Sequence, residues 1–142
     1  MRYSVRPAEV LDVDNGLLET LGNLQETGLH PLDAKQVLED MILSPVYRMY
    51  VAVSGKTVIG VATLLIEQKL IHNGGKVGRI EDVATKPGCE RLGIGFNLVG
   101  QLVVEAQVAG CYKVILECNE NNVPFYSKIG FHRHEVGMRM DL

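Results

Sequence analysis

The sequence contains no tryptophan, and aromatic residues make up only 6% of its 142 residues. It also lacks an apolar run approaching the ~20 residues that a membrane-spanning helix requires. The first six residues, Met-Arg-Tyr-Ser-Val-Arg, lack the apolar stretch of a secretory signal. We therefore expect a cytoplasmic protein that does not bind a membrane.

Clusters of basic residues are missing as well. The 14 Lys and Arg are outnumbered by 17 Asp and Glu, which gives a formal net charge of −3. Nucleic-acid binding needs a basic stripe that displaces the counterions of the phosphate backbone. The charge balance therefore argues against a nucleic-acid partner and favours a small-molecule substrate.

Metal-binding and disulfide patterns are absent from the cysteines. Cys89, Cys111 and Cys118 form no Cys-x-x-Cys motif, and no matching histidine pair completes a zinc site. We expect free thiols in a reducing compartment and no bound metal. Cys118 falls in a predicted buried strand, where a cysteine is more often a small hydrophobic residue than a nucleophile.

What is present is an ordinary globular composition, with 46% hydrophobic and 22% charged residues. The length suits one domain, residues 1–142, because a chain of this size can bury a single core. Neither an internal repeat nor a low-complexity linker divides it.

Hydrophobic spacing predicts four helices. They cover residues 10–24, 33–41, 93–110 and 123–129. Runs rich in β-branched and aromatic residues predict six strands, at 2–6, 47–53, 57–68, 76–85, 113–118 and 131–140. Ser54-Gly55 predicts a hairpin, and Asn73-Gly74-Gly75 predicts a second tight turn.

The order of these elements is β-α-α-β-β-β-α-β-α-β. It predicts an α/β (α+β) fold with a mixed, mostly antiparallel sheet flanked by helices. The strict alternation of a doubly wound dinucleotide-binding fold is not seen.

A Gly-x-Gly motif, Gly93-Ile94-Gly95, stands where a loop passes into a predicted helix. Two glycines allow the backbone to approach a ligand, and the free N–H groups of a helix start bind phosphate. The alternative is a loop that only needs positive φ. Leu98 replaces the third glycine of a dinucleotide fingerprint, and no Gly-Lys-Ser/Thr follows, so nicotinamide binding and nucleotide hydrolysis are disfavoured.

Two segments around this motif resemble the GNAT acetyltransferase superfamily. They are Arg-Leu-Gly-Ile-Gly-Phe at 91–96 and Asn-Val-Pro-Phe-Tyr-Ser-Lys-Ile-Gly-Phe at 122–131. More narrowly, the segments IEQKLIH (66–72), GRIEDVA (78–84) and GCYKVILEC (110–118) resemble the glucosamine-6-phosphate N-acetyltransferase family. They cover most of residues 57–131 in the same order and spacing.

The resemblance implies transfer of acetyl from acetyl-coenzyme A to the amine of glucosamine 6-phosphate, a step of UDP-N-acetylglucosamine biosynthesis. The amine attacks the thioester directly in a ternary complex, without an acyl-enzyme. The cofactor lies in a V-shaped opening between a strand ending near Val83-Ala84 and one near Leu116-Glu117. Unpaired strand N–H groups there polarise the thioester oxygen, as in an oxyanion hole.

Cofactor contacts follow from the same resemblance. They fall on Val83, Ala84, Arg91, Leu92, Gly93, Ile94, Gly95, Phe96, Glu117, Asn122 and Tyr126. Tyr126 matches a tyrosine whose hydroxyl donates to the departing coenzyme A sulfur. Outside this context, a tyrosine is more often part of a core.

Glu81 and Asp82 match an acidic pair that binds the sugar and deprotonates or orients its amine. Adjacent strand residues point to opposite faces, so only one of them faces a given pocket unless a bulge intervenes. The alternative is a pair of solvated strand charges.

Further substrate contacts are implied for Lys69, His72, Tyr112 and Lys113. His72 has an alternative as a turn residue. Arg139 takes the place of a family arginine that aligns with Asp141, because the two lie on one face of the predicted last strand. Family members form homodimers whose last strands pair and whose sugar site is lined by both subunits.

The chain departs from the family at Glu90, where Arg or Gln is common, and at Gln25, where a threonine is common. Two other functions stay open. One is a GNAT enzyme for a polyamine, an amino acid or a protein lysine, and the other is a non-catalytic acyl-coenzyme A-binding subunit. A polyamine site should be acidic and a phosphate site cationic, and a non-catalytic subunit has little use for Glu81, Asp82 and Tyr126 together.

Overall fold

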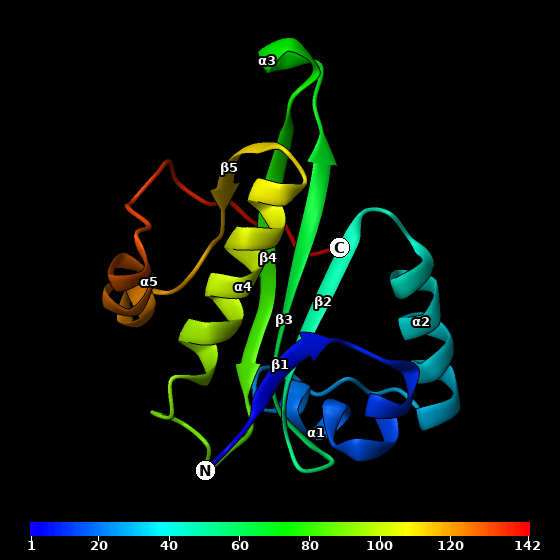
Figure 1. Ribbon diagram of the computed structural model, residues 1–142. Helices are drawn as coiled ribbons and strands as arrows, with labels where there is room; N and C mark the ends of the chain where they lie inside the picture. Colours follow the sequence, from blue (N-terminus) through cyan, green and yellow to red (C-terminus); the bar gives the residue numbers. More distant parts are fainter.

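Five strands form one sheet with helices on both faces in the computed structural model, which describes all 142 residues (Figure 1). The strands follow the chain in order: β1 (Ser4–Pro7), β2 (Tyr47–Ser54), β3 (Thr57–Gln68), β4 (Lys76–Thr85) and β5 (Cys111–Ile115). The first four are antiparallel, and β5 runs parallel to β4. The predicted mixed, mostly antiparallel sheet is confirmed.

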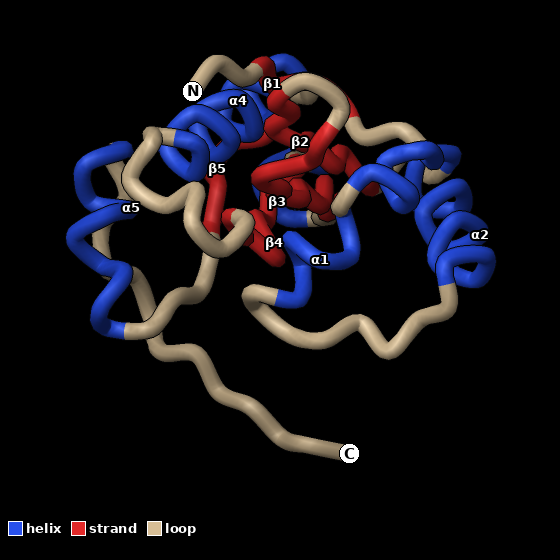
Figure 2. The backbone as a smooth tube through the Cα atoms, turned by 90° about the horizontal axis from the view of Figure 1, so that it is seen from below, coloured by secondary structure: helices blue, strands red, loops and turns tan.

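One face of the sheet is covered by α4 (Ile94–Val108) and α5 (Val123–Ile129) (Figure 2). The residues of α4 that are buried at every fourth position pack on the sheet: Ile94, Leu98, Leu102 and Ala106. This stripe is the helical periodicity read from the sequence. Because α4 carries the chain from the end of β4 back to the start of β5, it makes the parallel connection that two such strands need.

The opposite face is covered by η1 (Val10–Asn15), α1 (Leu17–Gly22) and α2 (Pro31–Leu43) (Figure 2). Their side chains form a second core with β2, β3 and β4, in which Leu17 and Leu38 meet Val51 and Val61. No helix of the structure is long and apolar enough to cross a bilayer.

The predicted single helix over residues 10–24 is wrong, because the structure divides it into η1 and α1. Gly16 separates them in a left-handed conformation, with a φ of 104°. A Cβ at this position would lie 3.3 Å from the Val58 carbonyl oxygen, so the turn also runs close to the start of β3. The apolar period continues across the break because both pieces face the same core.

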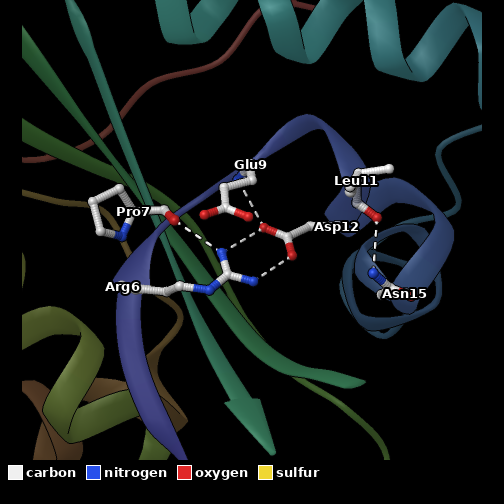
Figure 3. Close-up of polar contacts among 6 residues, drawn as sticks. All are labelled: Arg6, Pro7, Glu9, Leu11, Asp12 and Asn15. Atoms are coloured by element: carbon white, nitrogen blue, oxygen red, sulfur yellow. Dashed lines mark hydrogen bonds and ion pairs between the residues drawn. The ribbon is translucent and has the colours of Figure 1, made fainter. Parts of the chain in front are cut away.

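η1 is fixed to β1 by an ion pair between the buried Asp12 and the partly exposed Arg6 (Figure 3). The carboxylate of Asp12 is almost fully buried and accepts hydrogen bonds of 2.9 and 2.7 Å from the guanidinium of Arg6. It also accepts one of 2.7 Å from the Glu9 backbone N–H. The bond to Asp12 raises the pKa of Arg6 above its usual value. The charged carboxylate of Asp12 can thus remain buried, because nearby residues of the chain supply its hydrogen-bond donors.

Gly60 of β3 lies directly beneath α4. A Cβ here would overlap Ile94 Cγ2 and lie 3.0 Å from Leu98 Cδ1, two fully buried atoms of the helix. Glycine is therefore required by the close approach of helix and sheet rather than by its φ.

We predict that Gly60→Ala lowers the free energy of unfolding by about 1–3 kcal/mol, as overpacking of a filled core does. Urea denaturation monitored by circular dichroism measures it. The matched control is Gly100→Ala in α4, where an added Cβ meets nothing within 4 Å. Removing a helical glycine should stabilise the protein by up to about 1 kcal/mol. Equal midpoints for the two variants would contradict the packing described.

Two predicted strands differ from the structure. Residues 131–142 form no strand, and the tail has no sheet partner, although a Cβ at Gly137 would lie 3.4 Å from the Glu117 carboxyl carbon (Figure 2). Its alternating apolar residues, Val136, Met138, Met140 and Leu142, are exposed. The predicted strand at 131–140 is therefore wrong for a single chain, because an alternating pattern needs a neighbouring strand to pair with.

β5 spans Cys111–Ile115 instead of 113–118, and it is an edge strand instead of a buried one. Its outer side has no neighbour, so Tyr112 and Lys113 are exposed. Cys118 follows the strand and is exposed too, which overturns its expected place in a buried strand.

Candidate active site

Strands β4 and β5 separate at the point where the family resemblance predicts a V-shaped opening for the cofactor. β4 and β5 are paired from Lys76 and Cys111 to Arg79 and Ile115. Beyond this last rung β4 continues to Thr85, whereas the chain after Ile115 leaves the sheet towards α5 (Figure 1). We name this divergence the fork. From Ile80 onward, the edge of β4 that faces the fork has no strand partner, so its N–H and C=O groups are available.

At the far end of β4, a loop of residues 86–93 leads into α4. Arg91 and Gly93 both have left-handed backbones, with φ of 64° and 76°. Gly93 caps the helix without a side-chain hydrogen bond, which leaves the N–H groups of the first turn free. A free N-terminus of a long helix with a glycine at its cap binds diphosphate well.

Glu90 is tied into the same loop. Its carboxylate accepts a 2.8 Å hydrogen bond from the Gly88 backbone N–H. Arg91 is exposed and takes part in none of the ion pairs of the structure. The departure from the family at Glu90 is therefore accompanied by a free cation beside it, which suits an anionic ligand.

Tyr3 connects the start of the chain to this loop. Its hydroxyl accepts a 2.6 Å hydrogen bond from the Asn97 side chain and donates a 3.4 Å bond to the Leu92 carbonyl. The two partners lie on either side of Gly93 in the sequence, and a Cβ at Gly93 would lie 3.8 Å from the same hydroxyl. Tyr3 thus holds the entry to α4 in position from 89 residues away.

A β-bulge shapes the acidic pair of β4. Val61 pairs with Ala84 and Thr63 with Glu81, so Asp82 and Val83 together stand opposite one residue of β3. Asp82 takes up the extra length with a φ of 52°. The intervening bulge that could re-aim one carboxylate is therefore present.

Glu81 has an electrostatically perturbed carboxyl group. Glu81 is exposed, yet the protein atoms around its carboxyl group desolvate it and raise its pKa first, and the neighbouring Asp82 charge raises the pKa further. Glu117 across the fork adds to the increase, whereas Arg79 opposes it. A carboxylate with a raised pKa is a stronger base for an amine proton than an ordinary surface glutamate.

Tyr126 lies on α5 beside the start of α4. Its ring packs edge-on against Phe125 and Phe131, with centroids 4.9 and 5.9 Å away. Phe125 in turn lies 3.2 Å from the Cβ position of Gly95, so the second loop glycine allows α5 to approach α4. Burial, and then the nearby Cys118, raise the pKa of Tyr126. Its hydroxyl is therefore protonated at neutral pH and able to donate.

The remaining cofactor positions border the fork or the loop. Val83 and Leu116, one from each side of the fork, pack against the core beneath α4. Asn122 precedes α5 as its N-cap residue. Ile94 is buried under the first turn of α4, whereas Leu92 and Phe96 are exposed around it.

Two predicted substrate residues, Lys69 and His72, lie at the hairpin tip, residues 69–76, which includes α3 (Ile71–Gly74) (Figure 1), and Tyr112 and Lys113 of β5 lie beside it. His72 stacks on Tyr112 with ring centroids 4.0 Å apart, and the Lys113 ammonium lies 5.8 Å from the Tyr112 ring. His72 and Asn73 have left-handed backbones, as the predicted tight turn requires. Lys69 is paired with Glu67 at 2.6 Å.

The hairpin tip and the acidic pair are far apart within one chain. Five residues of extended β4 separate Gly75 from Glu81, and the six steps between them correspond to about 20 Å. Arg139 lies in the exposed tail and is bound to Asp141 at 2.7 Å, and its expected strand position is wrong. One chain therefore brings Glu81, Asp82 and Glu117 together, but not the predicted cationic residues with them.

Comparison with known proteins agrees with this geometry. Residues 17–131 match the family model described as acetyltransferase (GNAT) family. The chain belongs to the GNAT acetyltransferase family. It is thus an acetyltransferase, and enzymes of this family use acetyl-coenzyme A.

Within the GNAT family, the chain is similar to enzymes that act on an amino sugar phosphate. It is 37% identical over 139 residues to glucosamine 6-phosphate N-acetyltransferase of Candida albicans, covering 96% of this chain and 93% of that protein. It is 36% identical to glucosamine 6-phosphate N-acetyltransferase 1 of Dictyostelium discoideum, covering 98% and 90%. The crystal structure of glucosamine-6-phosphate N-acetyltransferase from Arabidopsis thaliana matches with a TM-score of 0.95 at 28% identity over 99% of each chain. The predicted fold and family resemblance are confirmed.

Two residues of this GNAT site, Tyr3 and Arg79, were not predicted as site residues from the sequence. Tyr3 reaches the α4 loop only through the folded sheet, and no local motif marks it. Arg79 lies inside the segment that resembles the family, and its charge between apolar neighbours was the available signal. No group of three or more His, Cys, Asp or Glu side chains is placed to hold a metal ion.

Proposed function

We propose that this acetyltransferase binds acetyl-coenzyme A between the α4 loop and the fork, and transfers its acetyl group to the amine of glucosamine 6-phosphate. The observation that carries the proposal is the combination of a free helix N-terminus with carboxylates on both sides of the fork. The similarity over nearly the whole chain to enzymes named for this substrate supports it.

Different residues bind the different parts of acetyl-coenzyme A. The first-turn N–H groups of α4 and the exposed Arg91 bind the diphosphate. The unpaired edge of β4 near Val83 and Ala84 holds the pantetheine arm and donates to the thioester oxygen as negative charge develops on it. The bound acetyl-coenzyme A supplies the activated acyl group.

Proton transfer falls to the carboxylates and the tyrosine. Glu81 accepts a proton from the ammonium form of the amine, so that the nitrogen lone pair is free to form the new C–N bond, and the second proton that the nitrogen loses on becoming an amide passes to solvent. Tyr126 gives its proton to the sulfur as the C–S bond breaks, and solvent restores it. Asp82 and Glu117 hold the sugar and its amine near Glu81.

The proposal is tested by the rate of thiol release with a panel of amines. Glucosamine 6-phosphate should give the highest kcat/KM, above glucosamine, spermidine and a lysine peptide. Equal values for glucosamine with and without phosphate would overturn the phosphate specificity. Preference for spermidine would assign the acidic fork to a polyamine instead, and saturable acetyl-coenzyme A binding without turnover would indicate a binding subunit.

We also infer a homodimer in which the sugar site is completed by a second copy. The hairpin tip carries Leu70 and Ile71 with 97% and 64% exposure, and the tail exposes alternating apolar residues. A partner's tip would bring Lys69, His72 and Lys113 to the sugar phosphate, because one chain holds these three residues away from its own fork. Sedimentation should show a dimer at micromolar concentration, and a monomer that is fully active would contradict this.

The pathway and compartment follow as parts of the same proposal. The product, N-acetylglucosamine 6-phosphate, would feed UDP-N-acetylglucosamine synthesis in the cytoplasm. Cell fractionation with an antibody to the chain tests the compartment, and recovery in a secreted or membrane fraction would refute it.

The contact made by Tyr3 gives a prediction for the cofactor. Tyr3→Phe should raise the Kd of coenzyme A roughly three- to tenfold, the value of one or two exposed hydrogen bonds, because the α4 loop loses its fixed position. Isothermal titration calorimetry measures it. Tyr47→Phe is the control, since the Tyr47 hydroxyl forms none of the side-chain hydrogen bonds in the structure. Equal Kd values for both variants would remove Tyr3 from the site.

A further inference from the structure

Arg79 stands at the apex of the fork. It forms the last rung between β4 and β5 with Ile115. Glu81 lies two residues further along β4, and Glu117 two residues beyond Ile115. Because side chains two residues apart on a strand share a face, Arg79 and Glu81 project to the same side of the sheet.

The guanidinium of Arg79 has one ion-pair partner and forms no hydrogen bond with it. Its closest acidic atom is a Glu117 oxygen at 3.8 Å, an ion pair that crosses the fork. It also acts electrostatically on Glu81 and on Glu67. Arg6 and Arg133 each bind one carboxylate through two hydrogen bonds, whereas Arg79 takes part in no side-chain hydrogen bond. Its five N–H donors are thus uncommitted.

Arg79 is reachable from solvent. Its side chain is one-third exposed and lines a concave groove together with Val46, Leu65 and Glu67. The Glu67 carboxylate in that groove is already held by Lys69. Apart from Glu67, the carboxylates nearest to Arg79 in its electrostatic surroundings are those of Glu117 and Glu81, and neither has another ion-pair partner.

We propose that Arg79 is a positioning residue for acetyl transfer: it holds the Glu117 carboxylate across the fork and offsets the repulsion between Glu117 and Glu81, so that the acceptor amine enters between the two carboxylates. This inference rests on the proposed function, since it assigns Glu81 the role of base.

The charges around Glu81 predict how its pKa would change in the absence of Arg79. The charged groups that act on it are Asp82, Glu117 and Arg79, and of these only Arg79 lowers its pKa. Removing the Arg79 charge should therefore raise the pKa of Glu81. More of the base would be protonated at a given pH, so the acid limb of kcat/KM should move to higher pH. Glu117 would also lose the partner that crosses the fork.

The test compares Arg79→Gln, Arg79→Lys and the wild type in pH profiles of kcat/KM with glucosamine 6-phosphate. Arg79→Gln should lose roughly tenfold at the acid end, the size of one lost charge contact, and recover most of it at alkaline pH. Arg79→Lys should keep the wild-type limb. Arg48→Gln on β2 is the matched control and should leave the profile unchanged, because Arg48 donates to backbone carbonyls away from the fork.

The outcomes are separable from those of the proposed function. No thiol release by the wild type with glucosamine 6-phosphate would refute the proposed function itself. An active wild type with an Arg79→Gln limb at the same pH would overturn the role of Arg79 alone. An equal loss at every pH, with a lowered melting temperature, would make Arg79 a purely structural residue and would also overturn the inference.

Discussion

Replacing Tyr126 with phenylalanine is expected to lower kcat by about 100-fold while KM changes by less than about twofold, the pattern of a lost general acid. The hydroxyl acts only as the sulfur leaves, so its removal weakens the transition state and not substrate binding. Partial burial keeps the hydroxyl protonated through the range of ordinary assays, since it raises the pKa of Tyr126. Steady-state thiol release with both substrates varied measures the two constants.

The phenylalanine variant keeps the ring that packs between Phe125 and Phe131. Its melting temperature should therefore stay close to the wild-type value, which separates chemistry from folding. Tyr47→Phe serves again as the control and should have wild-type kcat. Unchanged turnover in Tyr126→Phe would remove this residue from the mechanism, and a rise in KM alone would make it a binding residue.

The largest expected loss of stability comes from Asp12→Ala, which should lower the free energy of unfolding by about 3 kcal/mol. The substitution leaves Arg6 without its carboxylate and the Glu9 N–H without its acceptor. Equilibrium denaturation in urea, with unchanged slope, measures the difference.

Asp14→Ala is the matched control, because it removes a half-exposed aspartate two residues along the same η1 segment. Its pair with Lys35 should contribute less than about 1 kcal/mol. The double variant Arg6→Met with Asp12→Leu should recover much of the stability, since no charge is then left buried. Equal losses for Asp12→Ala and Asp14→Ala would show that the buried pair has no special weight.

Local patterns predicted most of the sheet. β3, β4 and α5 begin and end at the predicted residues, because long β-branched runs and a short turn leave few alternatives. The predictions failed where the conformation depends on contacts made elsewhere. Gly16 interrupts a continuous apolar period, and nothing in that period shows that its backbone is left-handed. The tail beyond Phe131 has the pattern of a strand but no partner in its own chain.

The sequence predicted which residues belong to the site, but only part of their arrangement in space. The Gly-x-Gly motif marked the helix start correctly, since a glycine cap has a local signature. The sequence showed only that a bulge would be needed for both carboxylates to face one pocket. It did not show that the bulge at Asp82 is present, because the bulge arises from the register between β3 and β4. His72 and Glu81 belong to neighbouring segments of the sequence, yet an extended strand holds them apart, so the spacing alone did not separate the hairpin tip from the fork.

Acetyl transfer to a sugar nitrogen at the fork is the reaction on which the proposed roles of these residues depend. The most direct measurement is the NMR spectrum of the product formed from acetyl-coenzyme A and glucosamine 6-phosphate, with free thiol quantified in the same sample. The account predicts an amide at the sugar amine in an amount equal to the released thiol, without acetylated protein. Thiol release with no amide, or acetyl found on a side chain of the enzyme, would contradict it.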